Sequence, residues 1–161
     1  MHRLAIALVV IVPLAASHVL AQATPNLSGR WLLNYERSGR GVTGNSPDVV
    51  FPSELTVSQT PTELSVRRAS VRQAPFSAVY KLDGSRITVD APAGISETAQ
   101  AKFDGATLVI TYRRSFSSPA GDVVTDFRED WNVNGTMLTI KKTVTQEGES
   151  QSETAAYDKS A

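Results

Sequence analysis

The sequence contains no cysteine, and its only two histidines, His2 and His18, lie within the first 23 residues. The rest of the chain therefore cannot build a Ser-His-Asp or Cys-His nucleophile arrangement. It also lacks the imidazole and thiolate ligands of ordinary zinc and copper sites. Any catalysis would have to use carboxylates, lysine, arginine, tyrosine or serine. The sequence predicts no metal site, no cofactor and no specific catalytic residue.

An excess of one charge is missing as well. The chain has 16 lysines and arginines against 16 aspartates and glutamates, so its formal net charge is zero. Removing Arg3, which lies in the first stretch, leaves 15 basic against 16 acidic residues. A nucleic-acid or anionic-membrane partner would call for a basic excess. The composition therefore predicts neither partner.

Long hydrophobic runs are absent except at the start of the chain. Residues 4–16 are apolar, Arg3 precedes them, and the small residues Ala21 and Ala23 follow at spacings suited to cleavage. This order is typical of a secretory signal peptide, and the apolar run is short for a membrane span of about 20 residues. We predict a signal peptide over residues 1–23 and a secreted or periplasmic protein.

The remainder, residues 24–161, is predicted to form one domain with no transmembrane segment. A chain of this length buries roughly two-thirds of its unfolded surface, so one core can hold it together. An exported protein without cysteine has no disulfides and must rely on that core. The sequence does not indicate the oligomeric state.

Alternation with a period of two dominates residues 24–161, in segments rich in valine, isoleucine, threonine and aromatic residues. Such alternation predicts half-buried β-strands. The predicted strands are Arg30–Tyr35, Leu55–Gln59, Leu64–Arg68, Phe76–Leu82, Arg86–Val89, Glu97–Phe103, Thr107–Ser115, Val123–Val133, Met137–Thr145 and Glu153–Asp158.

Three hairpins share one layout, in the segments YKLDGSRITV, AKFDGATLVI and WNVNGTMLTI. Asp-Gly and Asn-Gly pairs supply the positive φ values that two-residue hairpin turns require. Serial hairpins of this kind make an up-and-down meander, and closure into a barrel removes exposed edges. We predict an all-β, lipocalin-like meander barrel of about 8–10 antiparallel strands.

One connection, residues 36–52, is long, rich in glycine and without a periodic pattern. Connections of this length are typical of lids and binding loops. Residues 39–44 within it match the GxGxxG pattern of dinucleotide sites. That motif needs a following crossover helix, and no helical pattern follows here, so a loop is the better interpretation.

Charged residues fall on the predicted inner face of the strands. Arg68 shares a face with Leu64 and Val66, and Arg114 with Leu108, Ile110 and Tyr112. Glu97, Glu129 and Lys142 likewise share faces with apolar neighbours, away from the tight glycine turns. Because buried unpaired charge is costly, these groups must be paired, hydrated or placed at an opening.

Two interpretations of these charges compete. In the first, they ring a wet rim or pair with one another, for example Arg114 with Glu129 across the hairpin that turns at residues 117–121. In the second, arginines hold the anionic head of an amphiphile, because a guanidinium matches carboxylate geometry. The apolar tail would then lie against Phe103, Leu108, Ile110 and Trp131. The candidate ligand-binding residues are Arg68, Arg114, Tyr112, Glu129, Phe103 and Trp131.

Several short motifs resemble a known family. The segments NLSGRWLLNYERSG, ELTVSQ, DGATLVITYRR, EDWNVNGTMLTI and AYDKS look like those of a widespread, largely uncharacterised family of small secreted bacterial proteins described as lipocalin-like. Gly29 and Trp31 also resemble the first lipocalin signature. That resemblance implies a calycin-type barrel in which the tryptophan closes the base and an arginine near the last strand packs over it. The sequence offers no arginine at this place, and only Lys159 lies in the final segment.

Three functional hypotheses follow. The first is a non-enzymatic binding protein for a small apolar or amphiphilic ligand in a barrel cavity. The second is a structural or protein-interaction module of the cell envelope with a packed core. The third is a histidine-free hydrolase or isomerase that uses carboxylates or tyrosine, such as Glu97, Glu129 or Tyr112.

Overall fold

The computed structural model describes residues 24–39, 51–70, 74–89, 95–119 and 121–160. Within these ranges the chain forms ten β-strands and no helix. The described part accordingly contains no helix that is long and apolar enough to cross a membrane. The predicted signal peptide and residues 40–50 of the long connection lie outside the described residues, so both stay predictions.

The strands follow one another along the chain. They are β1 (Gly29–Asn34), β2 (Glu54–Gln59), β3 (Glu63–Ala69), β4 (Phe76–Lys81), β5 (Ile87–Val89), β6 (Ile95–Asp104), β7 (Thr107–Ser118), β8 (Gly121–Asn134), β9 (Met137–Gln146) and β10 (Glu149–Ser160). Each predicted strand is present. The largest difference is at β10, which begins at Glu149 because Glu147 and Gly148 make a tight turn with φ values of 52° and 87°.

All ten strands belong to one antiparallel sheet, in the order β4-β3-β2-β1-β10-β9-β8-β7-β6-β5. Only the β1–β10 pair joins strands that are distant in sequence. The predicted up-and-down meander is therefore confirmed. The two ends of the sheet are brought together at a seam with β6, where Asp83, in the turn after β4, bridges to Lys102 and the Gly84 amide donates to the Ala101 carbonyl at 3.0 Å. The sheet thus forms a nearly closed barrel.

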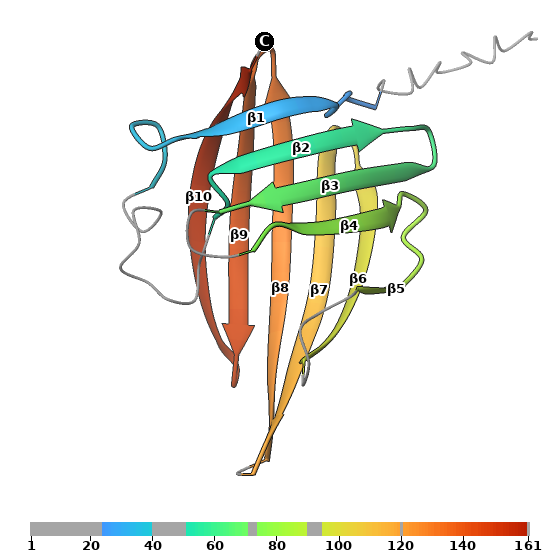
Figure 1. The fold of residues 1–161 in the computed structure, drawn as a ribbon, viewed down its shortest axis with the longest axis vertical. Coiled ribbons are helices and arrows are strands. Elements are labelled where there is room, and N and C mark those ends of the chain that lie inside the picture. Colours follow the sequence, from blue (N-terminus) through green and yellow to red (C-terminus); the bar gives the residue numbers. More distant parts are fainter. Residues whose placement is uncertain (1–23, 40–50, 71–73, 90–94, 120, 161) are drawn as a thin grey trace, which may run out of the picture.

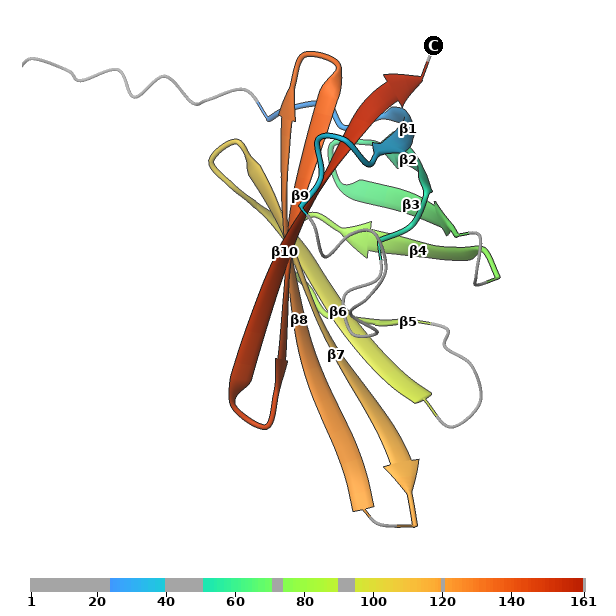
Figure 2. The same cartoon turned by 90° about the vertical axis from the view of Figure 1, so that its left-hand side faces the viewer.

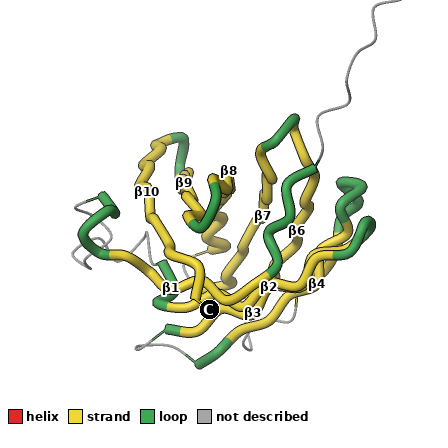
Figure 3. The backbone as a smooth tube through the Cα atoms, turned by 90° about the horizontal axis from the view of Figure 1, so that it is seen from above, coloured by secondary structure: helices red, strands yellow, loops and turns green. Residues whose placement is uncertain are grey.

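The sheet folds over on itself into two layers that cross steeply. In Figure 1, β1–β4 run across the upper half of the long strands β6–β10, and Figure 3 shows the curl of the sheet from above. The lower ends of β7 and β8 project well beyond β4 (Figures 1 and 2). The barrel therefore has a covered half, near the Asp-Gly and Asn-Gly turns, and an open half toward the β7–β8 turn.

The core lies between the layers in the covered half. Alternation places large apolar side chains from both layers there, as the sequence predicts. The largest side chains with under 2% exposure are Trp31, Trp131, Tyr80, Tyr157, Leu27, Leu55, Leu64, Leu108, Ile110, Leu138 and Val66. A side chain without accessible surface borders neither solvent nor a void that could hold water, so this half of the barrel is dry.

The base of the covered half is closed around Trp31. Its indole Nε1 donates to the Leu27 carbonyl at 2.9 Å, and the Lys159 Nζ lies 5.2 Å from the ring centroid. Lys159 thus lies over the tryptophan where the lipocalin resemblance implies an arginine. The contact depends on Gly29, whose φ is 141° and whose hypothetical Cβ would lie 2.6 Å from the Lys159 Cε.

Replacing Gly29 by alanine should therefore destabilise the protein. The backbone conformation is strained for any residue with a Cβ, at about 1–2 kcal/mol, and Lys159 would have to move off Trp31. Gly121→Ala is the control, because Gly121 has a φ of 119° and nothing within 4 Å of its hypothetical Cβ. We expect urea unfolding to show a larger loss of unfolding free energy for Gly29→Ala than for Gly121→Ala. Equal losses would mean that the contact between Lys159 and Trp31 contributes little to stability.

Candidate functional site

Five charged side chains meet on the inner face of the barrel, where the dry core ends. We call Arg68, Glu97, Arg114, Glu129 and Lys142 the inner charge layer. Arg68 comes from β3 in one sheet layer, and the other four come from β6, β7, β8 and β9 in the facing layer. Glu97 and Glu129 are the two buried carboxylates of the described residues, with exposures of 4% and 5%.

Glu129 is the centre of this layer. Its Oε2 accepts hydrogen bonds from the Trp131 Nε1 at 2.9 Å and the Arg68 Nη2 at 3.1 Å. Its Oε1 accepts from the Tyr112 hydroxyl at 3.2 Å and lies 3.8 Å from the Lys142 Nζ. Both carboxylate oxygens are therefore engaged, as a buried charge requires.

Arg68 links the two sheet layers. Besides Glu129 on β8, it donates from Nη1 to the Tyr80 hydroxyl on β4 at 2.9 Å. Its guanidinium also lies 5.8 Å from the centroid of the Trp131 ring. The Arg68–Glu129 ion pair therefore holds the crossed layers together at the boundary of the dry core.

Arg114 pairs with Glu97 and not, as the sequence suggested, with Glu129. Its Nε and Nη2 donate to the Glu97 Oε2 at 2.8 and 2.6 Å. The strand register explains this: Arg114 lies directly opposite Glu97 on β6, whereas Glu129 lies opposite Ile110. The Arg114 side chain is 46% exposed, so this pair forms the more open edge of the inner charge layer.

Two stacked aromatic rings form a wall beside the cations. Tyr112 and Phe127 lie opposite each other on β7 and β8, with ring centroids 4.5 Å apart. The Lys142 Nζ lies 5.7 Å from the Tyr112 centroid and 5.4 Å from the Phe127 centroid. The Arg114 guanidinium lies 5.4 Å from the Phe127 centroid. These distances suit cation–π attraction.

The layer contains three cations and two carboxylates, and their proximity shifts the pKa values. Burial lowers the pKa of Lys142, aided by Arg68 and Arg114, although Glu129 opposes the change. Burial alone would raise the pKa of Glu129, but Arg68 and Lys142 outweigh it and lower the pKa. Burial, with Glu129 nearby, raises the pKa of the Tyr112 hydroxyl well above its usual value.

Glu153 is the next carboxylate on the inner side, opposite Lys142 on β10. Its Oε2 lies close to Gly39, at 2.9 Å from the position that a Cβ there would take. It therefore points toward the start of the long connection. The charges that act on the pKa of Lys142 come from the inner charge layer itself.

The open half of the barrel begins on the other side of this layer. Ile95, Phe116 and Val123 lie in one row across β6, β7 and β8, on the same face as the inner charge layer. Phe116 is 49% exposed and Val123 is 42% exposed. An apolar inner surface thus continues from the charges toward the β7–β8 turn.

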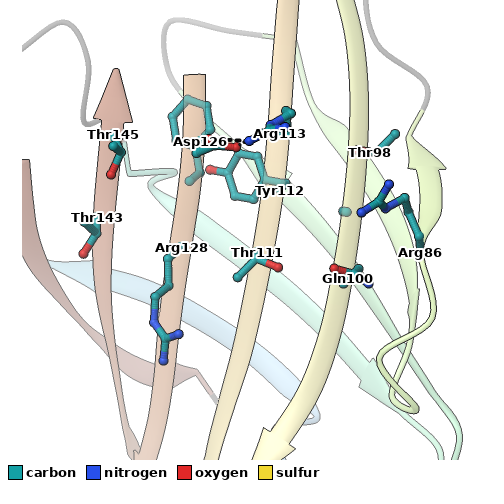
Figure 4. A pocket seen from close by; sticks show the side chains of 12 residues that line it. Arg86, Thr98, Gln100, Thr111, Tyr112, Arg113, Asp126, Arg128, Thr143 and Thr145 are labelled. Atoms are coloured by element: carbon teal, nitrogen blue, oxygen red, sulfur yellow. Dashed lines mark hydrogen bonds and ion pairs between the residues drawn. The ribbon is translucent and has the colours of Figure 1, made fainter. Parts of the chain in front are cut away.

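The outer face of the same strands carries a polar groove of about 410 Å³ (Figure 4). Two rows of outward side chains cross it, and Figure 4 shows Arg113 and Asp126 joined by their ion pair on this face. The groove is lined by Arg86, Thr98, Ala99, Gln100, Thr111, Tyr112, Arg113, Asp126, Phe127, Arg128, Thr143 and Thr145. Most of these residues belong to the outer-face rows, whereas Ala99, Tyr112 and Phe127 belong to a row of the inner face.

The structure brings together most of the candidate residues but not all. Arg68, Tyr112, Glu129 and Trp131 contact one another, and Arg114 lies beside them through Phe127. Phe103 stands apart, opposite Leu108 near the β6–β7 turn, where it packs on the core. The ligand-binding role of these residues stays a prediction.

Three contributors were missing from the candidate residues: Tyr80, Phe127 and Lys142. Alternation already placed Lys142 on the inner face. Tyr80 occupies the same position in its hairpin segment as Trp131, so the repeat could have indicated it. Phe127 shares a face with Glu129 and could have been found in the same way.

Glu129 does not suit the role of general acid in the carboxylate-enzyme hypothesis. A general acid at neutral pH needs a raised pKa, whereas Arg68 and Lys142 lower that of Glu129. Within the described residues no group of three or more acidic side chains could hold a metal ion.

Comparison with known proteins shows the fold. No protein-family model and no curated protein sequence matches the chain. Among solved structures, a secretory abundant heat soluble protein from Ramazzottius varieornatus has a TM-score of 0.58 at 13% identity, covering 87% of this chain and 99% of that one.

Zebrafish ileal bile acid-binding protein, complexed with cholic acid, has a TM-score of 0.54 at 12% identity, covering 83% and 98%. Echinococcus granulosus fatty-acid-binding protein 1 has a TM-score of 0.51 at 18% identity, covering 84% and 98%. The chain therefore has a lipocalin-like barrel fold of the type seen in fatty-acid-binding proteins.

Proposed function

We propose that the protein is an exported, non-enzymatic binding protein for a small amphiphilic molecule with an acidic head group. The head group would lie against Arg68, Arg114 and Lys142, and the apolar part would extend toward the β7–β8 turn. The observation that carries this proposal is the inner charge layer, which places three cations and two carboxylates where the dry core ends and the open half begins.

Charge balance supports the acidic head group. Arg68 pairs with Glu129, and Arg114 pairs with Glu97. Lys142 lies 3.8 Å from Glu129, which it shares with Arg68. The layer therefore has three cations around two carboxylates, and a ligand carboxylate would gain charge-assisted hydrogen bonds from arginine. Tyr112 and Phe127 would provide the wall beside the head group.

The direction of the ligand follows from burial. Leu108 and Ile110 have 0% exposure, so they border no space that a ligand tail could occupy. Phe116 and Val123 offer exposed apolar surface on the other side of the charges. We therefore place the ligand tail opposite to the direction that the sequence suggested, and we leave Phe103 out of the proposed contacts.

The fold neighbours support a ligand of this class. Their titles describe one as a bile acid-binding protein complexed with cholic acid and another as a fatty-acid-binding protein. Cholic acid and fatty acids are amphiphiles with a carboxylate. Barrels of about this strand number can hold one small ligand. Export to the periplasm or the medium, as for a secreted bacterial family, belongs to the same proposal and rests on residues 1–23.

A dansyl-labelled undecanoic acid probe tests the proposal directly. We expect fluorescence enhancement on binding to the purified chain, and native mass spectrometry should detect a bound amphiphile. Arg114→Gln should weaken probe binding by about tenfold, the value of one charge-assisted interaction. A neutral probe with an alcohol in place of the acid should bind equally to both proteins.

Arg113→Gln is the matched control. Arg113 is the preceding residue, and it points to the outer face, where it pairs with Asp126. This variant should bind the probe as the unaltered chain does. If the chain takes up no probe and carries no ligand, or if both variants behave alike, the proposal is wrong.

A second candidate function is a protein-interaction module of the cell envelope. The apolar side chains Phe116, Val123 and Val124, exposed on both faces of the β7–β8 hairpin, favour it. The two candidates differ in the probe experiment, since an interaction module would not distinguish Arg114→Gln from Arg113→Gln.

A further inference from the structure

The polar groove of about 410 Å³ on the outer face, which we call the outer groove, crosses the strands. One rim is the row that contains Arg113 and Asp126, and the other is the row that contains Thr111 and Arg128. The row between them, which includes Tyr112, belongs to the inner face and leaves a trough between the rims. Because neighbouring strands lie about 4.8 Å apart, a groove from β6 to β9 spans roughly 14 Å and suits an extended molecule.

The side chains on the two rims are polar, and arginines outnumber carboxylates among them. Arg86, Arg113 and Arg128 line the groove together with one carboxylate, Asp126. With Asp130, the partner of Arg128, there is still one arginine more than there are carboxylates. The neutral rim residues are Thr98, Gln100, Thr111, Thr143 and Thr145. The zero net charge of the whole chain therefore does not describe this groove, which favours an anionic ligand.

Two of these arginines are held in position by carboxylates. The Arg113 Nε and Nη2 donate to the two oxygens of Asp126 at 2.7 and 2.8 Å. The Arg128 Nε and Nη2 donate to the Asp130 Oδ1 at 3.0 and 2.7 Å. A guanidinium has five N–H donors, more than one carboxylate accepts, and these side chains are 64% and 51% exposed. A ligand would therefore meet guanidinium groups that are already oriented, which lowers the entropic cost of binding.

Arg86 differs from the other two arginines, because no ion pair joins it to any described carboxylate. It is exposed and directly precedes β5. Figure 4 shows its side chain reaching toward β6, between Thr98 and Gln100. An exposed arginine without a carboxylate partner, at one end of the groove, is suited to pair with a carboxylate of a ligand.

The kind of polymer follows from what the rims present. Among the described lining residues the two aromatic ones, Tyr112 and Phe127, belong to the inner-face row. Bases and the apolar faces of neutral sugars bind by stacking on aromatic rings, so the groove favours neither. Charge and hydrogen bonds are the remaining means of recognition. An acidic polysaccharide offers carboxylates to the arginines and hydroxyl groups to the threonines, and each sugar advances the chain by about one strand spacing.

We propose that the outer groove binds a linear polysaccharide that carries carboxylates, that is, a polyuronate. Its carboxylates pair with Arg86, Arg113 and Arg128, and its hydroxyl groups bond to the threonine hydroxyls and the Gln100 amide. The inference does not depend on the proposed function, because none of these residues belongs to the inner charge layer. It gives the barrel a second binding face, for a polar ligand.

Isothermal titration calorimetry of the purified chain with tetragalacturonate, a linear acidic tetrasaccharide, tests the inference. We expect binding that weakens as the salt concentration rises, because exposed charges are screened. Maltotetraose, which is neutral and of equal length, should not bind. Inorganic tetrapolyphosphate, which has charge but no sugar hydroxyls, should bind at least tenfold more weakly than tetragalacturonate. Equal binding of the polyphosphate, or no binding of tetragalacturonate, would overturn the inference.

Two variants locate the binding site. Arg86→Gln and Arg128→Gln should each weaken the binding of tetragalacturonate by about tenfold, the value of one charge-assisted interaction. Lys141→Gln is the matched control, because it removes the same charge from an exposed residue of the outer face, one row beyond the groove lining. This variant should bind as the unaltered chain does. Equal losses in all three variants would indicate diffuse attraction and overturn the site.

The result is separable from the proposed function. Arg113→Gln should weaken the binding of tetragalacturonate and keep that of the dansyl-labelled acid, whereas Arg114→Gln should do the reverse. A chain that binds the dansyl-labelled acid but no tetragalacturonate would overturn the outer groove and leave the proposed function intact. A chain that binds tetragalacturonate alone would support the outer groove and contradict the proposed function.

Discussion

Glu129→Gln should lower the free energy of unfolding by about 3–5 kcal/mol at pH 7, the range for removing one partner of a buried ion pair. The glutamine keeps the shape of the side chain but removes the charge that Arg68 and Lys142 face. Its amide nitrogen would also direct hydrogens at one of these donors. Urea unfolding followed by the fluorescence of Trp31 and Trp131 measures the effect.

Asp126→Asn is the control for this prediction. Asp126 lies on the same strand, and its pair with Arg113 is exposed on the outer face. The loss there should not exceed about 1 kcal/mol, as for exposed ion pairs. The double variant Arg68→Met with Glu129→Leu should recover much of the stability, since no unpaired arginine is left. A cost for Glu129→Gln no larger than that for Asp126→Asn would show that the inner charge layer is well hydrated.

The fold could be predicted because each level of the sequence indicates the same structure. Alternation located ten strands, and the Asp-Gly and Asn-Gly pairs marked turns whose glycines, Gly84, Gly105 and Gly135, adopt positive φ. The serial order of hairpins then fixed the neighbours of most strands. The steep crossing of β1–β4 over β6–β10 was beyond this reasoning, because it depends on sheet twist and on contacts between distant segments.

The inner face could be predicted, but the pairs on it could not. Period-two alternation assigns Arg68, Glu97, Arg114, Glu129 and Lys142 to one face without any knowledge of register. The partner of Arg114 depends on which residue of β6 lies opposite it, and that is set by the length of the β6–β7 hairpin. The Arg68–Glu129 pair joins residues 61 positions apart across the barrel, so only the folded chain brings them together.

The location of free space was likewise hidden from the sequence. The sequence predicts that Leu108 and Ile110 contact the ligand, because they share a strand face with Arg114. In the structure both side chains have 0% exposure and belong to one core cluster with Trp31, Leu55 and Leu64 of the crossing layer. The open apolar surface lies instead on the other side of the inner charge layer, where the strands are longer than the alternation pattern predicted. β7, for example, ends three residues later than predicted.

Lys142→Met should raise the free energy of unfolding at pH 7, on the order of 1 kcal/mol. The groups around the amine are Glu129 on β8, Arg68 on β3, Tyr112 and Arg114 on β7, Glu97 on β6 and Glu153 on β10. Burial, Arg68 and Arg114 outweigh Glu129 and lower the pKa of Lys142. A charged ammonium here therefore costs stability, and the thioether of methionine fills a similar volume without charge.

The pH dependence gives the sign of this effect. The unfolded chain keeps the lysine proton up to a pH of about 10.4, whereas the folded chain releases it at a lower pH. Stability should therefore rise with pH across that window. Above a pH of about 10, the raised pKa values of Tyr80, Tyr112 and Tyr157 reverse the trend, because the folded chain keeps protons that the unfolded chain has lost.

Lys142→Met should abolish the rise of stability with alkaline pH and keep the later fall, as urea unfolding measured from pH 7 to pH 11 would show.

A barrel that served only as a packed module would be more stable with methionine in place of this lysine. A buried amine that lowers stability is typical of a site that binds or reacts, where function is retained at the expense of stability. The result expected for a binding site is a Lys142→Met chain that is more stable and no longer binds the dansyl-labelled undecanoic acid. A variant that is less stable than the unaltered chain would contradict the sign of the pKa change and show that Lys142 acts chiefly as a structural partner of Glu129.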